Sequence, residues 1–249
     1  MFEYYFGKLL EQLSLDFNCT PEDLQSGENI VTTSVLLKGR RWYTPVKPFL
    51  QMVTTGRNVV VMADERIQDF MRDYIKGKPG HWFFEHRNLS VLDEELKKYG
   101  YKLTQSHHMF LPCRDVTVEE KYPVKWFFGE DIKQFYGDER FPNAICPEFT
   151  PERPDRIAAI AYDGDKIMGM AGCSEDAPGW EQIGIDVMPE YRSKGVGSYL
   201  VTLVKNKIIE RGEIPFYGTA AANLHSQNIA LNCGFKPAWV EVPTLKPEG

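Results

Sequence analysis

The chain has 249 residues, 43% hydrophobic and 26% charged, which is ordinary for a globular protein and excludes a disordered one. A net charge of −6 argues against a general nucleic-acid binder, and a mean hydropathy of −0.38 argues against a membrane protein. The N-terminus lacks a signal-peptide pattern, and the five cysteines are far apart and form no metal-binding spacing. We therefore expect a reduced, cytoplasmic protein without a metal site.

The first part of the chain is predicted to be an α/β segment. Apolar residues at helical spacing predict a helix around 6–13, and Thr20 followed by Pro21 marks a second helix start. Asp64 and Ser90 are expected to cap two further helices. The strands predicted here are 31–37, 59–62, 81–84 and 101–111.

The pattern loosens around 113–122, where we place a domain boundary. Residues 1–118 would form an N-terminal α/β lobe, and residues 119–249 a second domain. After a short helix at 130–136 and a proline-rich loop at 143–155, the pattern becomes regular again. The elements predicted next are a hairpin of strands 156–162 and 166–173 with a type I′-like turn, a strand at 181–188, a helix at 196–211, a strand at 214–219, a helix at 223–233 and a strand at 236–242.

A glycine-rich motif, RSKGVGS at 192–198, lies between the predicted strand 181–188 and the helix that follows. Glycines allow several N–H groups to point toward one ligand, and a helix N-terminus adds partial positive charge. This combination predicts a cradle for an anion such as a pyrophosphate. The motif is not a dinucleotide fingerprint, because Leu200 stands where the third glycine would be.

Residues 125–243 resemble the GCN5-related N-acetyltransferase (GNAT) family. The resemblance is carried by the sequence IGIDVMPEYRSKGVG at 183–197, by the hairpin before it and by NLHSQNIALNCGF at 223–235. With KPAWVEV at 236–242, the chain is similar to the subgroup of zwittermicin A self-resistance acetyltransferases. The resemblance implies an α/β (α+β) fold class, with a mixed, splayed sheet flanked by helices.

The resemblance also implies acetyl-CoA as co-substrate, with no metal. Backbone groups of Val187 and Met188 would pair with the pantetheine arm. Asn223 would hydrogen-bond the pantetheine, a role compatible with that of a plain helix N-cap. The N–H groups expected to hold the pyrophosphate are those of Arg192, Ser193, Lys194, Gly195, Val196, Gly197 and Ser198.

Acetyl transfer needs a neutral amine, a route for its proton and a group that protonates the leaving thiolate. The family usually attacks directly, without a cysteine nucleophile. Ala230 stands where many members carry a tyrosine acid, so Tyr217, His225 or solvent would substitute. Asp186 and Glu181 are the candidate bases; their odd spacing on one strand puts them on opposite faces, so only one can point into the acceptor cleft. The alternative for Asp186 is a structural hydrogen-bonding role.

One constant offset aligns elements of the two halves. It places the helix that starts at Asp64 on the one from Ser198, residues 82–83 on 216–217, and residues 99–102 on 233–236. We hypothesise that the N-terminal lobe is a degenerate GNAT-like repeat that binds no CoA. The alternative is a generic α/β accessory lobe.

These observations predict an N-acetyltransferase that acts on an amine of a small molecule by direct attack in a ternary complex. The acidic balance favours a cationic acceptor. We expect neither a nucleic-acid nor a membrane partner, and leave a homodimer open. One alternative, motivated by Ala230, is a non-catalytic acyl-CoA-binding sensor or interaction module; another is transfer of a longer acyl group.

Overall fold

The computed structural model describes residues 1–41 and 46–246. The chain divides into two compact units. Unit 1 consists of Met1–Tyr5 and Phe110–Pro237, and unit 2 of Phe6–Met109 and Ala238–Gly249. Each unit thus contains two separate segments, whereas the predicted domains, 1–118 and 119–249, are each continuous. Within the described residues, no helix has both the length and the apolarity needed to cross a bilayer.

Unit 2 contains a sheet whose order is β1-β3-β2-β11, with β1 and β3 parallel and the other neighbours antiparallel. A short strand, β4, pairs with the end of β11. The strands are β1 (Ile30–Thr33), β2 (Leu50–Thr54), β3 (Val60–Ala63), β4 (Lys102–Leu103) and β11 (Phe235–Leu245). The helices are α1 (Phe2–Phe17), η1 (Asp23–Gln25), α2 (Glu65–Ile75), α3 (Gly80–Phe83) and α4 (His86–Lys97).

A buried arginine joins three segments of unit 2. Arg41 is 1% exposed; its Nε lies 2.5 Å from Asp16 Oδ2 on α1, and its terminal nitrogen lies 2.6 Å from Glu241 Oε2 on β11. Trp239 Nε1 donates to the same Glu241 oxygen at 2.8 Å. Because each charge is buried, removing one partner would leave the other uncompensated.

Several predictions for this region are confirmed and others are wrong. Asp64 caps α2 as predicted, its side chain accepting from the N–H of Arg66. The helix start predicted at Thr20 leads only to the single 3₁₀ turn η1. Ser90 is not a cap, because α4 already begins at His86. The predicted strand 101–111 is two strands, β4 and β5 (His107–Pro112).

The aromatic run at 81–84 is not a strand: residues 81–83 belong to the short helix α3, which follows Pro79, and Phe84 comes directly after it. Gly80 sits against the preceding loop, where a Cβ would come within 2.5 Å of the carbonyl oxygen of Arg57. Phe83 is buried, whereas Trp82 is 52% exposed. The run therefore contributes one ring to the core, and its hydrophobicity alone misled the strand prediction.

Because residues 81–83 are helical, the hypothesis that the N-terminal lobe repeats the GNAT-like half is wrong at the offset that the sequence predicted. The offset matches residues 82–83 with 216–217, but the first pair is helical and the second lies in β10 (Ile214–Ala220). What the two halves share is local: Gly100 and Gly234 both have positive φ, at 76° and 82°, after a helix. Unit 2 thus has helices and a sheet, and its role as an accessory lobe stays a prediction.

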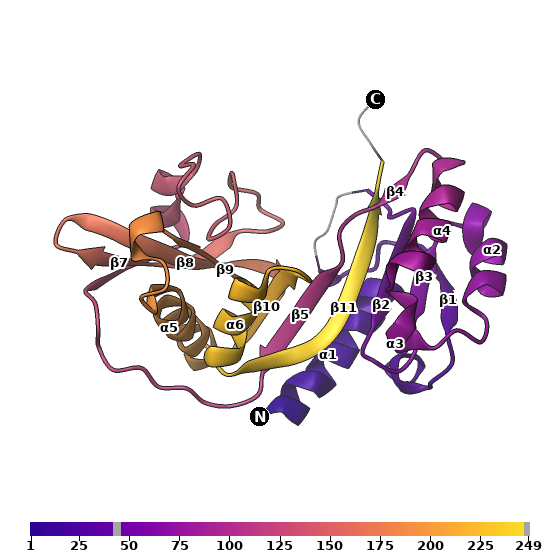
Figure 1. Cartoon of the computed structure of the whole chain (residues 1–249), viewed down its shortest axis with the longest axis horizontal. Helices are drawn as coiled ribbons and strands as arrows, with labels where there is room; N and C mark the ends of the chain where they lie inside the picture. The colour runs from indigo at the N-terminus through magenta and orange to yellow at the C-terminus, as the bar shows by residue number, and fades with distance from the viewer. Residues whose placement is uncertain (42–45, 247–249) are drawn as a thin grey trace. The chain divides into compact units, whose positions relative to one another are not determined.

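Unit 1 contains a mixed sheet with the order β11-β5-β10-β9-β8-β7-β6 (Figure 1). Strands β6 to β9 are antiparallel neighbours, and β10 runs parallel to β9. The further strands are β6 (Val124–Phe128), β7 (Asp155–Asp163), β8 (Lys166–Ala177) and β9 (Trp180–Val187). The helical elements are η2 (Gly129–Phe135), η3 (Pro189–Tyr191), α5 (Val196–Glu210) and α6 (Leu224–Asn232).

The sheet of unit 1 is covered on both faces. Leu200 and Val204 of α5 join one buried cluster with Ile157 of β7, and α6 packs beside α5 (Figure 1). On the other face, Ile132 of η2 lies in a second cluster with Ile160, also on β7. Since side chains of a strand alternate between faces, β7 serves both clusters. The predicted mixed sheet flanked by helices is confirmed. The β7–β8 hairpin is also confirmed, but its turn has positive φ only at Gly164, which excludes type I′.

Two glycines opposite each other allow a loop to lie directly on this sheet. Gly172 of β8 pairs with Gly184 of β9. A Cβ on Gly172 would come within 2.4 Å of the Ala144 carbonyl oxygen. A Cβ on Gly184 would overlap the carbonyl oxygen of Asn143. The loop around 143–144 therefore requires hydrogen atoms at both positions.

Gly184→Ala should destabilise the protein by more than about 2 kcal/mol, because the added methyl group must push the loop off the sheet. Urea denaturation measures the free energy of unfolding. Gly7→Ala is the matched control: Gly7 is exposed on α1 with nothing near its missing Cβ, so alanine should stabilise by about 0.5–1 kcal/mol. Equal stability of Gly184→Ala and the wild type would contradict this packing.

Candidate functional site

Strands β9 and β10 separate at one end of unit 1. Their paired residues run from Trp180 with Ile214 to Ile183 with Tyr217, whereas β9 continues to Val187 and β10 continues to Ala220. β9 stays paired with β8 on its other edge, as far as Val187 with Gly169. A wedge with one unpaired strand edge on each side therefore opens, as predicted.

Only some backbone N–H and C=O groups of β9 face the wedge. The carbonyl of Val187 accepts a bond from Arg192 Nε at 3.2 Å and points away from β8. The backbone N–H of Met188 points toward β8, where it donates to the carbonyl of Met168. The carbonyl of Met188 accepts from the N–H of Tyr191. Because backbone direction alternates along a strand, Ile185 shares the direction of Val187. Val187 and Ile185 thus border the wedge, while both backbone groups of Met188 are used within the protein.

The predicted anion cradle connects η3 to α5. Ser193 and Gly195 have positive φ, at 60° and 81°, and Gly195 is the N-cap of α5 without a side-chain cap. The first N–H groups of a helix have no partner within it, and here they belong to Val196, Gly197 and Ser198. Residues 192–195 are exposed. The loop therefore presents free donors at the positive end of a 15-residue helix.

Two residues that the sequence analysis missed hold this loop. Lys121 Nζ donates to the carbonyl of Lys194 at 3.2 Å, and the hydroxyl of Tyr122 donates to the same oxygen at 3.1 Å. Lys121 Nζ also lies 3.6 Å from the position of a Cβ on Gly195. A cation therefore stands beside the cradle. No local motif could reveal it, because it comes from a segment more than 70 residues earlier.

Two further observations fit an elongated ligand that bears a phosphate group. A Cβ on Gly197 would come within 3.0 Å of Ile229 Cδ1 and 3.5 Å of Val187 Cγ2, so glycine brings the start of α5 close to the wedge. Thr219 lies on β10 beyond the last pair with β9, and its buried hydroxyl has no hydrogen-bond partner among the described residues. A buried polar atom without a partner is costly, which a ligand in the wedge would relieve.

The helix α6 begins beside the wedge. Asn223 is its N-cap, as predicted, and Oδ1 accepts from the N–H of Ser226 at 3.2 Å. Its Nδ2 group is the side-chain donor that this cap leaves for a ligand. His225 is exposed in the first turn of α6, and Ala230 is fully buried one turn further on. Tyr217 is 1% exposed, and burial raises its pKa to about 12.

Asp186 anchors the loop that crosses the sheet. Its Oδ2 accepts from the N–H groups of Asn143 and Ala144, both at 2.8 Å, and its Oδ1 accepts from Asn143 Nδ2 at 2.7 Å. Both oxygens are therefore engaged by the loop. This is the structural alternative that the sequence left open for this carboxylate.

Glu181 lies at the opposite end of β9. The strand rises about 3.3 Å per residue, so roughly 16 Å of strand separate Glu181 from Asp186. Glu181 faces Cys173 on the α5 side of the sheet, while Asp186 faces the loop on the other side, so the predicted opposite orientation is confirmed. The structure does not bring Glu181 to the wedge, so it is not positioned to act as a base there.

Burial raises the pKa of Glu181 to about 8, and the carboxylates of Glu213 and Glu175 add to this rise. The side chain is fully buried, and neither oxygen accepts a hydrogen bond of good geometry from the described residues. A carboxyl group in such surroundings keeps its proton at neutral pH. Glu181 is thus a buried neutral acid whose ionisation would cost folding free energy.

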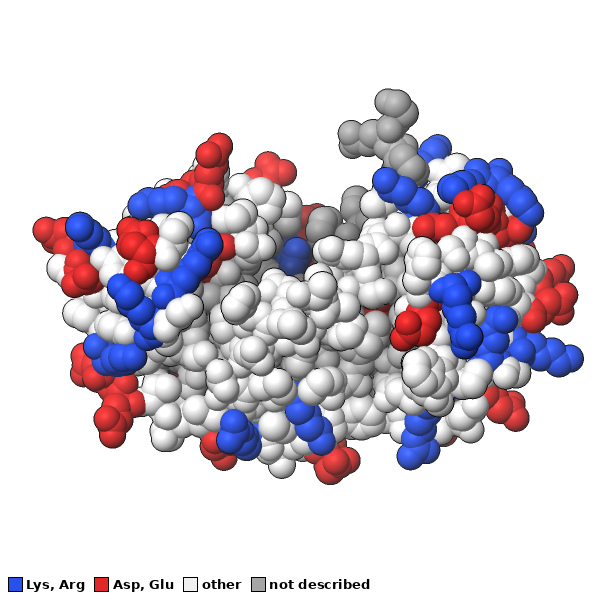
Figure 2. Space-filling model, in the orientation of Figure 1, with Lys and Arg blue, Asp and Glu red and all other residues white. Residues whose placement is uncertain are grey.

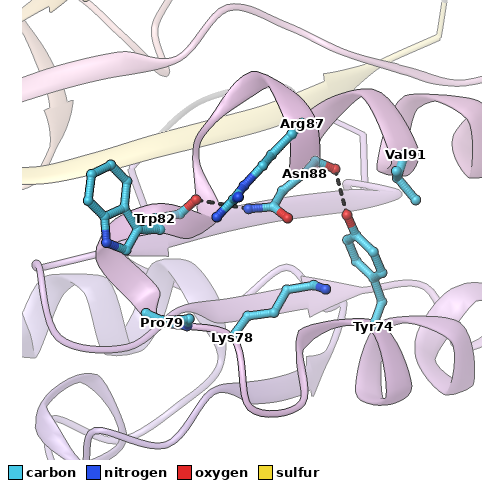
Figure 3. A pocket seen from close by; sticks show the side chains of 7 residues that line it. All are labelled: Tyr74, Lys78, Pro79, Trp82, Arg87, Asn88 and Val91. Carbon is cyan, nitrogen blue, oxygen red and sulfur yellow. Dashed lines mark hydrogen bonds between the residues drawn. The ribbon is translucent and has the colours of Figure 1, made fainter.

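A second concave region lies in unit 2, where an open pocket has a volume of about 410 Å³ (Figure 3). The hydroxyl of Tyr74 donates to the carbonyl of Asn88 at 2.9 Å, and Asn88 Nδ2 donates to the carbonyl of Trp82 at 2.8 Å. None of the predicted site residues contributes to this pocket. Its lining residues are Tyr74, Lys78, Pro79, Trp82, Arg87, Asn88 and Val91.

Comparison with known proteins agrees with the fold of unit 1. The model of the Acetyltransferase (GNAT) family matches residues 121–235, which extend from just before β6 to the start of β11. This match supports a GNAT acetyltransferase assignment for that part of the chain, and its fold is the mixed α+β GNAT fold. No curated protein matches the sequence.

Solved structures similar to this chain include proteins from several bacteria. A putative GNAT-family acetyltransferase from Novosphingobium aromaticivorans is 16% identical, with a TM-score of 0.48 over 60% of this chain and 69% of its own. A GCN5-related N-acetyltransferase-like protein from Streptococcus suis is 13% identical, with a TM-score of 0.48 over 64% and 68%. A Bacillus subtilis acetyltransferase in complex with CoA is 17% identical, with a TM-score of 0.38 over 51% and 100%.

Stability should fall as pH rises through the range set by Glu181. Between its ordinary pKa of 4.5 in the unfolded chain and about 8 in the folded protein, the folded state retains a proton that the unfolded state releases. The free energy of unfolding falls between these two pH values, and by pH 8 the total decrease is on the order of 3–5 kcal/mol. Glu181→Gln should flatten this dependence, measured by urea denaturation at several pH values. Glu94→Gln, at an exposed site, serves as the control; parallel profiles for wild type and Glu181→Gln would refute the assignment.

Proposed function

We propose that the chain is an N-acetyltransferase that transfers the acetyl group of acetyl-CoA to an amine of a small molecule. The observation that carries this proposal is the wedge between β9 and β10, which opens beside a loop of free N–H groups at a helix N-terminus. The loop suits a pyrophosphate, and the strand edge suits the amides of a pantetheine arm. The family match over residues 121–235 supports the same reaction class.

In this proposal, the N–H groups of residues 193–198 hold the pyrophosphate of CoA, and Lys121 adds a positive charge; the N–H of Arg192, also expected there, donates to the carbonyl of Pro189 instead. The backbone of Val187 pairs with the pantetheine, and Ile185 extends that edge. Asn223 donates from Nδ2 while its Oδ1 remains the helix cap. Bound acetyl-CoA supplies an activated acyl group; the residues of the chain bind it, orient it and exclude water.

Direct attack by the amine, in a ternary complex, is the mechanism that we propose. Burial raises the pKa of Cys233, the cysteine whose Sγ lies 3.2 Å from the carbonyl oxygen of Ser198 beside the cradle. A thiol with a raised pKa is a poor nucleophile, so an acyl-enzyme on this residue is disfavoured. Asp186 is proposed to position the loop at 143–144 rather than to take the amine's proton.

The acceptor is proposed to be a cationic amine, as the net charge of −6 favours. In Figure 2, acidic and basic side chains are interspersed, so this preference comes from the overall balance rather than from a patch of one sign in that view. Membership of the zwittermicin A resistance subgroup is a finer proposal on the same basis, carried by KPAWVEV at 236–242.

A non-catalytic acyl-CoA sensor is the second candidate, favoured by one observation. Ala230 is fully buried at the position where the family often carries its tyrosine acid. Release of thiol from acetyl-CoA distinguishes the candidates. The enzyme should release thiol faster with at least one member of a library of primary amines, and mass spectrometry should detect the acetylated product. Binding of acetyl-CoA without turnover on any amine would support the sensor instead.

Gly195→Glu should abolish CoA binding, because it adds bulk and negative charge where φ is +81° and the N–H groups converge. Lys121→Ala should weaken binding about tenfold, since one charge-assisted contact is lost. Isothermal titration calorimetry with CoA measures both. Lys97→Ala, an exposed lysine of unit 2, is the control and should bind as the wild type does. Unchanged binding by Gly195→Glu would remove the cradle from the proposal.

A further inference from the structure

Two hydroxyl groups meet where β9 and β10 separate. The oxygen of Tyr217 lies 2.8 Å from Ser226 Oγ, and either atom could be the donor. Tyr217 is the last residue of β10 that pairs with β9, and its ring lies in the core of unit 1. Ser226 is half-buried in the first turn of α6. The pair thus connects the buried strand to the helix beside the wedge.

Ser226 is the hydroxyl-bearing residue on the face of α6 that this site uses. Asn223, Ser226 and Ala230 are three and four residues apart, so they lie on one face of the helix. Asn223 uses Oδ1 as the cap and Nδ2 is assigned to the pantetheine, while Ala230 offers only a methyl group. Gln227 lies between them as well, but its Nε2 donates to the carbonyl of Ala221 at 2.7 Å, so the hydroxyl donor between the cap and the buried alanine is that of Ser226.

The hydroxyl of Tyr217 is buried in an apolar cluster, where Ser226 Oγ is the acceptor that the described residues offer it. Burial is the main cause that raises its pKa; the hydrogen bond with Ser226 lowers it, and the charge on Asp186 raises it further. The phenol therefore keeps its proton at neutral pH. Phe235, 6.2 Å away between ring centres, belongs to the same apolar cluster. With Tyr217 donating to Ser226 Oγ, the hydrogen of Ser226 is free to point elsewhere.

We propose that Ser226 donates a hydrogen bond to the CoA sulfur as the acetyl group leaves, and that Tyr217 orients the Ser226 hydroxyl. This inference rests on the proposed function. The new bond forms between the amine nitrogen and the acetyl carbon, and the electron pair of the broken C–S bond goes to sulfur. The amine's proton ends on sulfur by way of solvent, so Ser226 and Tyr217 both keep their own. Ser226 is then the catalytic residue, and Tyr217 a positioning residue.

The first test needs no turnover. The ultraviolet absorbance of the thiolate, followed against pH, gives the pKa of the CoA thiol while it is bound. Ser226→Ala should raise this value by about one pH unit over the wild type, because a donor to the thiolate is lost. Ser226→Thr keeps the hydroxyl and should restore the wild-type value. Tyr217→Phe should give an intermediate value.

The second test separates chemistry from binding. Ser226→Ala should lower kcat about 10- to 100-fold and leave the KM for acetyl-CoA within about twofold. Asn228→Ala, on an exposed position of the same helix, is the matched control and should change neither the bound thiol pKa nor kcat. Thermal melts show whether each variant is folded before it is compared.

Three outcomes overturn the inference. The first is a bound thiol with the same pKa in Ser226→Ala as in the wild type. The second is the expected rise in Thr219→Ala instead, which would assign the donor to the unpartnered hydroxyl on β10. The third is a wild-type protein that binds no CoA in calorimetry, which overturns the proposed function as well. Binding without turnover on any amine removes the enzymatic proposal and with it the catalytic role of Ser226, whereas an unchanged thiol pKa in Ser226→Ala of an active protein removes the inference alone.

Discussion

The separation of β9 from β10 is the constraint on which the site of unit 1 depends. β9 is no longer paired with β10 beyond Ile183, while its other edge stays paired with β8 as far as Val187. The separation leaves backbone groups without strand partners at the end of a buried sheet, and such groups require a partner from elsewhere. The same opening gives access to the start of α5, to the cap of α6 and to the part of β10 that bears the hydroxyl of Thr219.

The site is supported from both faces of the sheet by different means. On one face, α5 and α6 approach β9 closely because residue 197 has no side chain to keep them apart. On the other face, the loop at 143–144 lies on Gly172 and Gly184 and is fixed by Asp186. The edge of β9 is thus held between a helical layer and a loop layer. A strand supported in this way can remain unpaired along one edge without collapsing onto its neighbour.

Most of the unit 1 fold could be predicted from the sequence, because its signals are local. The β7–β8 hairpin, the glycine loop and the cap at Asn223 each lie within a few residues of the feature that they specify. The contacts that hold the glycine loop and the loop at 143–144 could not be predicted in this way. Lys121 and Tyr122 act on Lys194 from a distant segment, and whether Asp186 binds a substrate or a loop depends on what folds over it.

The errors have an equally physical origin. The aromatic run at 81–84 has the composition of a strand, but Pro79 and the tight contact at Gly80 start a helix. Glu181 and Asp186 are both carboxylates on one strand, and the strand's length puts only Asp186 near the wedge. Composition and spacing specify which face a residue takes, but not which end of the sheet the ligand will use.

Because β5 and β11 each contribute residues to both units, neither unit corresponds to a continuous stretch of the gene. A fragment from residue 119 onward would lack β5, which lies between β10 and β11 in the sheet, and would retain residues 238–245, whose pairing partner β2 is missing. The complementary fragment would expose the edge of β2 to solvent, as an adhesive strand edge. Isolating unit 1 therefore calls for circular permutation or for co-expression of both fragments rather than for a single cut.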